Sequence, residues 1–372
     1  MRKVNAMDSE FKIVWPEPLT QLCRQVFEKL GVPAKDAITT SEVLVLADLR
    51  GIDSHGVARL RRYYNGLKTG MMFPKPEIKV VYETPVSARI DGGGALGQVA
   101  GRKGMDLAIE KALKNGFGFV AVGNSNHYGI AAYYSLMALK HDLIGISLTN
   151  SDAYVVPTFG RSVMLGTNPI SVTVPTKKEK PFVLDMSTAV ATLGKVEVYG
   201  RMGKKIPQGW ATDESGQSCD DPVRVLANIK GKVGGGLLPL GGVGEEFGGH
   251  KGYGLDLLVD ILSGVLSGSA NTNLLYPKTS DGKPLPSLVG HFFGAMRIDF
   301  FRPVEDFKKD MDDLIRRLRN SPKAEGCDRI YIHGEKEFEL EEKYRKEGIP
   351  LYYKVYDDLK AIAGEVGVAF TL

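Results

Sequence analysis

The sequence predicts an α+β fold with two domains: a helical domain built from both chain ends, and a central α/β domain. Apolar residues recur at helical spacing near both ends, whereas the middle of the chain alternates short apolar runs with helical patterns. A length of 372 residues is ample for two domains. We therefore expect a discontinuous helical domain at 1–77 and 303–372, and an α/β domain at 78–302.

The helices of the terminal domain are indicated by apolar periodicity and by residues that end helices. Gly31 with Pro33 is expected to end the first helix, and Gly51 to end the second. The expected helices lie at about 19–30, 34–50, 60–67, 307–318 and 356–365.

The middle of the chain is expected to form a sheet with covering helices. The most apolar helical run, 255–266, is short and contains Asp256 and Asp260, so it predicts a buried helix rather than a membrane span. The proline-rich stretch 271–287 predicts a long surface connection. Strands are expected at 78–82, 86–91, 117–122, 143–149, 171–175, 182–185 and 288–300, and helices at 98–115, 131–140 and 255–268.

The composition indicates a globular protein and argues against a nucleic-acid-binding one. Hydrophobic residues at 43% and charged residues at 25% are the usage of a globular protein. The net charge of +4 is small, and basic residues alternate with acids, as in 305–319, so nucleic acid is not an expected partner. The three cysteines lie far apart without metal-site spacing, and residues 1–11 lack an apolar stretch, so we expect reduced thiols, no secretory signal and a cytoplasmic protein.

A glycine-rich segment at 92–97 matches the dinucleotide pattern G-x-G-x-x-G between a strand and a helix. It fails two checks. The preceding strand, 86–91, alternates polar and apolar residues where a doubly buried strand is required, and the next strand ends in Val-Gly-Asn where an acid for the ribose is expected. The segment therefore predicts a turn or a close backbone approach, and not a Rossmann fold.

Two histidines are the candidate proton-transfer groups. His55 lies in Asp-Ser-His-Gly-Val-Ala-Arg at 53–59, and His127 in Gly-Asn-Ser-Asn-His-Tyr-Gly at 123–129. Imidazole exchanges a proton near neutral pH, and Arg59 can hold a carboxylate through two hydrogen bonds. Taken alone, His55 could equally be an ordinary loop residue, whereas a site role is favoured for His127 over a polar turn. Because His55 lies in the terminal part of the chain and His127 in the central part, a joint site would lie between the domains.

Two further segments have the composition of ligand-binding loops. Asp-Met-Ser-Thr at 185–188 follows a short apolar strand, where ligands commonly bind in α/β sheets, although Asp185 could instead cap a helix. The segment 248–254 combines four glycines with Lys251 at the expected start of a helix, which suits a phosphate but could also be a simple connection. No His-Glu-x-x-His pattern or cysteine–histidine cluster indicates a metal.

The motifs taken in order resemble the type-2 malate/L-lactate dehydrogenase family. Its malate dehydrogenase branch is the most similar, through Leu-Leu-Pro-Leu-Gly-Gly at 237–242. The resemblance covers nearly the whole chain and rests on the segments 49–56, 124–129, 166–169, 184–187, 249–254 and 333–335.

The resemblance implies a homodimeric, cytoplasmic oxidoreductase whose central domain binds NAD or NADP without a Rossmann fold. It would transfer a hydride between the cofactor and a 2-hydroxy acid/2-oxo acid pair, either malate/oxaloacetate or lactate/pyruvate. By motif, His127 and His55 would be the acid/base candidates, while Ser54 and Arg59 would face the substrate. The implied cofactor residues are Ser151, Asn168, Asp185, Met186, Ser187, His250, Lys251, Gly334 and Glu335.

Other interpretations stay open at this point. His333 stands where many relatives have proline before the Gly-Glu pair, which puts the local cofactor contact in doubt. Relatives also act on sulfopyruvate, diketogulonate, piperideine-2-carboxylate or ureidoglycolate. A non-catalytic binding protein and a metal-dependent hydrolase are the alternatives outside redox chemistry. Neither the acid nor the choice between NAD and NADP follows from the residues.

Overall fold

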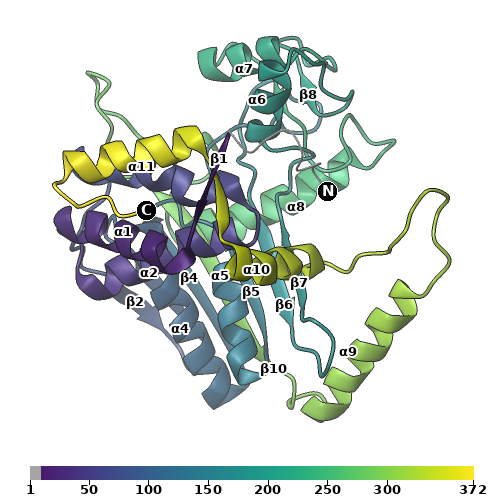
Figure 1. Ribbon diagram of the computed structural model, residues 1–372. Helices are drawn as coiled ribbons and strands as arrows, with labels where there is room; N and C mark the ends of the chain where they lie inside the picture. Colours follow the sequence, from purple (N-terminus) through teal and green to yellow (C-terminus); the bar gives the residue numbers. More distant parts are fainter. Residues whose placement is uncertain (1–9) are drawn as a thin grey trace.

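A seven-stranded sheet lies at the centre of the computed structural model, which describes residues 10–372 (Figure 1). The strand order is β2-β3-β4-β10-β5-β6-β7. The strands are β2 (Lys79–Glu83), β3 (Ser87–Asp91), β4 (Phe117–Ser125), β10 (Val289–Arg297), β5 (Leu143–Thr149), β6 (Ile170–Val174) and β7 (Phe182–Met186).

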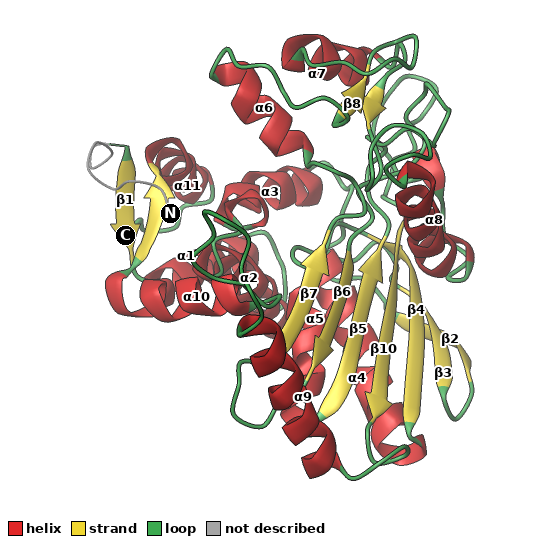
Figure 2. Cartoon of the chain, turned by 90° about the vertical axis from the view of Figure 1, so that its right-hand side faces the viewer, coloured by secondary structure: helices red, strands yellow, loops and turns green. Residues whose placement is uncertain are grey.

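The pairing of these strands brings several loops to one edge of the sheet. Only β3 and β4 run parallel in this sheet, joined by the crossover helix α4 (Gly97–Asn115), and all its other neighbours are antiparallel. Consequently β3, β4, β5 and β7 end at the edge where β6 and β10 begin. We call this the upper edge, since it is uppermost in Figure 2. Helix α4 packs on β4 and β10, and α5 (Ala132–Met137) packs on β5 and β6.

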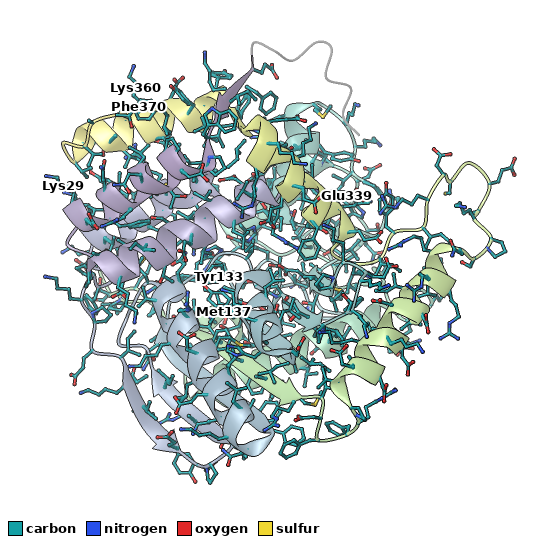
Figure 3. All side chains as sticks on the ribbon, turned by 60° about the horizontal axis from the view of Figure 1, so that its bottom comes forward. Lys29, Tyr133, Met137, Glu339, Lys360 and Phe370 are labelled. Atoms are coloured by element: carbon teal, nitrogen blue, oxygen red, sulfur yellow. The ribbon has the colours of Figure 1, made fainter. Side chains whose placement is uncertain are left out.

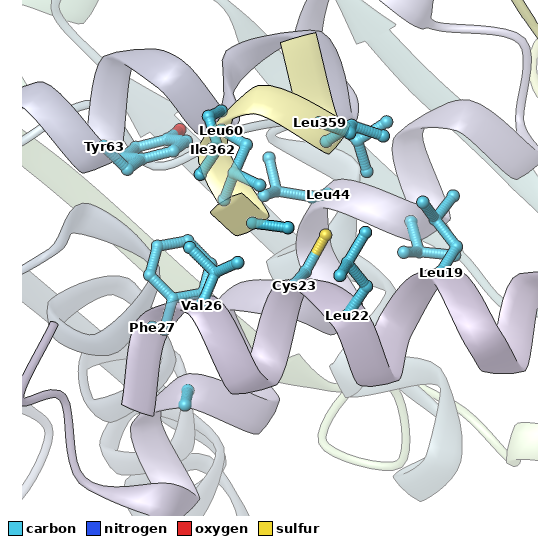
Figure 4. Packing of buried hydrophobic residues seen from close by; sticks show 14 of the residues in the cluster. Leu19, Leu22, Cys23, Val26, Phe27, Leu44, Leu60, Tyr63, Leu359 and Ile362 are labelled. Carbon is cyan, nitrogen blue, oxygen red and sulfur yellow. The ribbon is translucent and has the colours of Figure 1, made fainter. Parts of the chain in front are cut away.

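The two chain ends share one hydrophobic core (Figure 4). Cys23 and Leu44 pack with Leu359 and Ile362, so the first and last helices of the chain lie together. Strand β1 (Phe11–Val14) also pairs antiparallel with β11 (Ile349–Tyr352). The helices of this core are α1 (Pro16–Lys29), α2 (Ala34–Leu49), α3 (Leu60–Lys68) and α11 (Tyr353–Glu365). The predicted α+β class, with a helical unit made from both ends, is confirmed.

The proposed boundary at residue 303 remains a proposal. Helix α9 (Val304–Arg319) begins there, but its buried Asp312 accepts backbone hydrogen bonds from Lys177, Lys178 and Glu179 in the β6–β7 connection. The helix therefore contacts a connection of the central sheet. Helix α10 (Glu335–Glu347) contacts α2 and β11 of the terminal unit instead.

A direct link between the two units is formed by Tyr133 of α5, which is labelled in Figure 3. Its hydroxyl donates to Glu42 Oε2 on α2 at 3.1 Å and accepts from Arg102 Nη1 on α4 at 3.0 Å. The terminal helices are thus tied to the helical layer that covers the sheet.

Several elements are absent from the sequence-based prediction. A small cluster beyond the upper edge contains α6 (Leu193–Arg201), α7 (Pro222–Gly231) and the two-residue strands β8 (Ala211–Thr212) and β9 (Gly236–Leu237). Along with these, β1, α10 and β11 were not predicted, because short strands and a helix as charged as α10 give little apolar periodicity. Strand β5 has the predicted bounds, whereas the predicted 131–140 helix is α5 followed by a 3-10 turn, η3 (Ala138–His141).

A helix is present in the region predicted at 255–268, but the prediction that it is buried is wrong. Helix α8 (Gly249–Asp260) begins earlier and continues as a π-helical turn, η4 (Ile261–Val265). Its acids are buried: Asp260 accepts from Asn150 Nδ2 at 3.0 Å, and burial raises the pKa of Asp256 to about 8, so that this carboxyl is neutral at pH 7. The apolar residues face outward instead, with 40 to 56% exposure at Leu255, Leu258, Ile261, Val265 and Leu266.

None of the helices described for residues 10–372 has both the length and the apolar character needed to cross a membrane. The predicted absence of a secretory signal concerns residues 1–11, and 1–9 lie outside the described residues.

Candidate active site

The glycine-rich segment 92–97 holds the loop that carries His127. Gly92 N and Gly94 N donate to Gly123 O and Asn124 O, each at 2.8 Å. A Cβ at Gly97 would overlap the carbonyl oxygen of Asn126, so only glycine permits this approach. The predicted close backbone approach is confirmed, and the pattern that imitates a dinucleotide site has a structural role.

The ring of His127 is fixed from its Nδ1 side. The Tyr63 hydroxyl lies 2.7 Å from His127 Nδ1, and the backbone nitrogen of Gly129 lies 3.4 Å from the same atom. This leaves Nε2 to contact a ligand. Tyr63 comes from α3 and packs in the terminal core, so this hydrogen bond joins the two parts of the chain.

His55 lies at the end of a 3-10 turn, η1 (Asp53–His55), and its Nδ1 is 2.9 Å from Ser54 Oγ. Buried Asp48 of α2 supports the neighbouring turn, η2 (Val57–Arg59), by accepting the Val57 N–H at 2.8 Å. A Cβ at Gly56 would overlap the Asp48 carboxylate. Asp48 was not predicted as a support, because nothing in its local sequence separates it from other helical acids.

The two imidazoles stack, with ring centroids 5.4 Å apart and planes inclined by 22°. The expected meeting of His55 and His127 is therefore confirmed. Burial, followed by the charges of Arg59 and Arg62, lowers the pKa of His55 to about 4. Burial, followed by Arg62 and His55, lowers the pKa of His127 well below its usual 6.5. Both rings are consequently neutral at pH 7.

The end of η2 and the first turn of α3 supply the polar groups around these rings. Arg62 and Tyr63 of α3 follow Arg59, the residue before the helix, by three and four positions, a spacing that brings side chains to one side of a helix. Arg59 Nε donates to Ser54 O at 2.6 Å, and Arg62 Nη2 donates to the Tyr276 hydroxyl at 2.9 Å. Arg62 and Tyr63 were not singled out from the sequence, although their spacing from Arg59 could have identified them.

Several candidate cofactor residues gather at the upper edge. Ser151, just beyond β5, donates its N–H to Asn168 Oδ1 at 3.0 Å, and Asn168 immediately precedes Pro169 and β6. Met186 ends β7 opposite Ile170, and Ser187 follows it. Asp185 accepts the Ala132 N–H at 2.9 Å, and burial raises the pKa of Asp185 to about 6.

The remaining candidates lie in two other places. His250 and Lys251 are exposed in the first turn of α8, and Lys251 lines an open hollow of about 380 Å³ with Gly248 and Phe247. Gly334 and Glu335 begin α10 beside Val183, near the start of β7. The Glu335 carboxylate is already paired with Arg319 and Arg329. The structure thus does not bring Gly334 and Glu335 to the upper edge.

Comparisons with known proteins establish the family. The model of malate/L-lactate dehydrogenase matches residues 14–360. The chain belongs to the malate/L-lactate dehydrogenase family. The resemblance inferred from the ordered motifs is confirmed, and with it the prediction of an oxidoreductase for a 2-hydroxy acid/2-oxo acid pair.

Individual relatives match over nearly their full length. The malate dehydrogenase of Pyrococcus abyssi is 49% identical over 362 residues, which cover 97% of each chain. The L-sulfolactate dehydrogenase of Methanocaldococcus jannaschii is 41% identical, with 96% of this chain and 98% of that protein covered. The solved malate dehydrogenase structure from Pyrococcus horikoshii OT3 superimposes with a TM-score of 0.88, at 43% identity, and covers 100% of both chains.

Gly97→Ala tests whether the glycine segment positions His127. The added Cβ must displace the 126–127 backbone, so we expect oxoacid reduction to fall by about a hundredfold, the scale of a 1 Å misplacement. The control is Gly364→Ala, at an exposed position of α11 where a Cβ meets no atom within 4 Å. Initial rates and thermal melting curves are measured together. Unchanged activity in folded Gly97→Ala protein would contradict the positioning role.

Proposed function

We propose that the enzyme interconverts malate and oxaloacetate by hydride transfer with NAD or NADP. The observation that carries this is the stacked pair of neutral imidazoles beside two guanidinium groups at the upper edge. Proton donors and a cation for the substrate carboxylate are what oxoacid reduction requires. The similarity to proteins named malate dehydrogenase favours malate over lactate.

The chemistry of the proposed cofactor residues fits a nicotinamide dinucleotide. Ser151 and Ser187 offer hydroxyl groups for ribose and carboxamide atoms, and Lys251 offers an ammonium group for phosphate at the start of α8. The buried Asn168 would act by holding Ser151, whose N–H it accepts. Asp185, Met186, His250, Gly334 and Glu335 complete the set that we propose. The bound cofactor would supply nicotinamide C4 as donor or acceptor of the hydride.

We propose His127 as the acid/base group. Its Nε2 would face the substrate, so the neutral ring must carry its proton on Nδ1, and the Tyr63 hydroxyl, 2.7 Å away, can accept from Nδ1–H in the neutral and in the protonated ring. Arg59 would hold the substrate carboxylate beside Ser54. In oxidation, neutral His127 takes the hydroxyl proton; in reduction, its protonated form returns that proton to the oxygen. His55, stacked on the same ring, is the alternative acid/base group.

Substrate binding would favour the protonated histidine that reduction needs. In the free enzyme, burial and the two arginines oppose protonation of both rings. A bound oxoacid brings negative charge to the arginines and so offsets their repulsion of an imidazolium. The enzyme would therefore take up a proton along with the oxoacid.

We also propose a homodimer formed through the outer face of α8 and η4. Five apolar side chains lie there at 40 to 56% exposure, the residues Leu255, Leu258, Ile261, Val265 and Leu266. A continuous apolar face of this kind on a folded chain indicates a protein contact, and a second copy is the simplest occupant.

The cysteines Cys23, Cys219 and Cys327 are unpaired, which supports the proposed cytoplasmic location.

A substrate panel tests the proposed function. Oxaloacetate, pyruvate, sulfopyruvate and piperideine-2-carboxylate are each assayed with NADH and NADPH by absorbance. We expect the highest kcat/KM with oxaloacetate, and the two cofactors are compared on that substrate. Absence of turnover with all four substrates would favour a non-catalytic binding protein.

The pH dependence of hydroxy acid oxidation tests the role of His127. The base must be unprotonated, and its pKa lies below 6.5, so kcat/KM should stay flat above pH 6.5 and fall only at lower pH.

His127→Ala should lower kcat by about two to four powers of ten while NADH binding, followed by fluorescence, persists. His55→Ala is the comparison variant. Full activity in His127→Ala would assign the acid/base role to His55.

A further inference from the structure

Arg62 is a cation without an acidic partner. It is half-buried on α3, and no carboxylate among residues 10–372 lies within ion-pair distance of it. Within residues 10–372 its guanidinium makes one hydrogen bond, which Nη2 donates to the neutral hydroxyl of Tyr276 at 2.9 Å. A guanidinium has five N–H donors, so most of its donor capacity remains for a ligand.

The position of Arg62 relative to the histidines places it in the active site. It directly precedes Tyr63 on α3, whose hydroxyl lies 2.7 Å from His127 Nδ1, and its charge lowers the pKa of both histidines. Arg59 ends η2 three residues earlier, directly before α3. Two guanidinium groups therefore lie near one pair of neutral imidazoles.

The surrounding acids do not neutralise this charge. Asp152 is the carboxylate with an influence on Arg62, but it makes no ion pair with it and instead accepts a hydrogen bond from Tyr154 at 3.0 Å. Tyr276 and Tyr154 are both neutral phenols at pH 7, because burial raises the pKa of each hydroxyl. Asp152 therefore offsets the charge of Arg62 only in part, and the positive charge that remains on Arg59 and Arg62 suits a ligand with more than one negative charge.

We propose that Arg62 binds a second anionic group of the substrate, so that the enzyme selects oxo and hydroxy acids carrying a further carboxylate or sulfonate. This rests on the proposed function, in which Arg59 holds the carboxylate next to the reacting carbon. Tyr276 accepts one N–H of the Arg62 guanidinium and leaves the other donors for this contact. A substrate with one carboxylate would leave Arg62 partly desolvated and unpaired, which is unfavourable.

The test compares a doubly charged substrate with a singly charged one. Initial rates with oxaloacetate, sulfopyruvate and pyruvate are measured for the wild type, Arg62→Met, Arg62→Lys, Arg59→Met and Tyr276→Phe. We expect Arg62→Met to lower kcat/KM for oxaloacetate by about ten- to a hundredfold, the scale of a charged hydrogen bond, and to change that for pyruvate by less than about threefold. Arg62→Lys keeps the charge and should lose less.

The other variants separate substrate binding from a structural role. Arg59→Met should lower the values for all three substrates, because the carboxylate it holds is common to them. Tyr276→Phe removes the hydrogen bond of Arg62 but keeps its charge, so the oxaloacetate to pyruvate ratio should change by less than about threefold. The sulfopyruvate results show whether the second anion can be a sulfonate. Melting curves confirm that each variant is folded.

Two results would overturn the proposal in different ways. Equal losses for oxaloacetate and pyruvate in Arg62→Met and in Arg62→Lys would show that Arg62 only connects α3 to the 271–287 segment, while the proposed function stands. Wild-type protein that turns over none of the three acids would overturn the proposed function, and the second anion subsite with it.

Discussion

The hydrogen bond between Tyr63 and His127 joins the two parts of the molecule on which the active site depends. The Tyr63 ring packs in the core made from both chain ends, next to Phe27 and Leu60, while its hydroxyl reaches the loop that follows β4 (Figure 4). The glycine segment 92–97 fixes that loop from the other side. Neither part alone contains both histidines, so the site exists only where the terminal core meets the upper edge of the sheet.

The distribution of charge at this junction favours the binding of an anion. Burial and the arginines keep both imidazoles neutral, so the fixed positive charge lies on Arg59 and Arg62. The buried Asp256 of helix α8 adds no opposing charge, because burial raises its pKa to about 8 and keeps it neutral at pH 7. Binding a negatively charged acid would therefore satisfy the arginines and make histidine protonation easier in the same step.

The sequence predicts most of the layout and part of the site. Helical periodicity at both ends and short strands between them are local signals, so the fold class could be inferred, and the failed checks at 92–97 correctly excluded a Rossmann fold. Two features could not be predicted from the sequence. The orientation of 255–268 depends on tertiary contacts that bury Asp256 and Asp260 and leave leucines exposed. Asp48 and Tyr276 act through partners distant in sequence, which no local pattern shows.

A double-mutant cycle between Tyr63 and His127 measures the central claim most directly. The kcat of oxaloacetate reduction is determined for wild type, Tyr63→Phe, His127→Ala and the double variant, with melting curves to confirm folding. If Tyr63 acts through His127, Tyr63→Phe should lower kcat by about tenfold in the wild-type background and have no effect once His127 is alanine. Equal losses from Tyr63→Phe in both backgrounds would contradict a site assembled through this hydrogen bond.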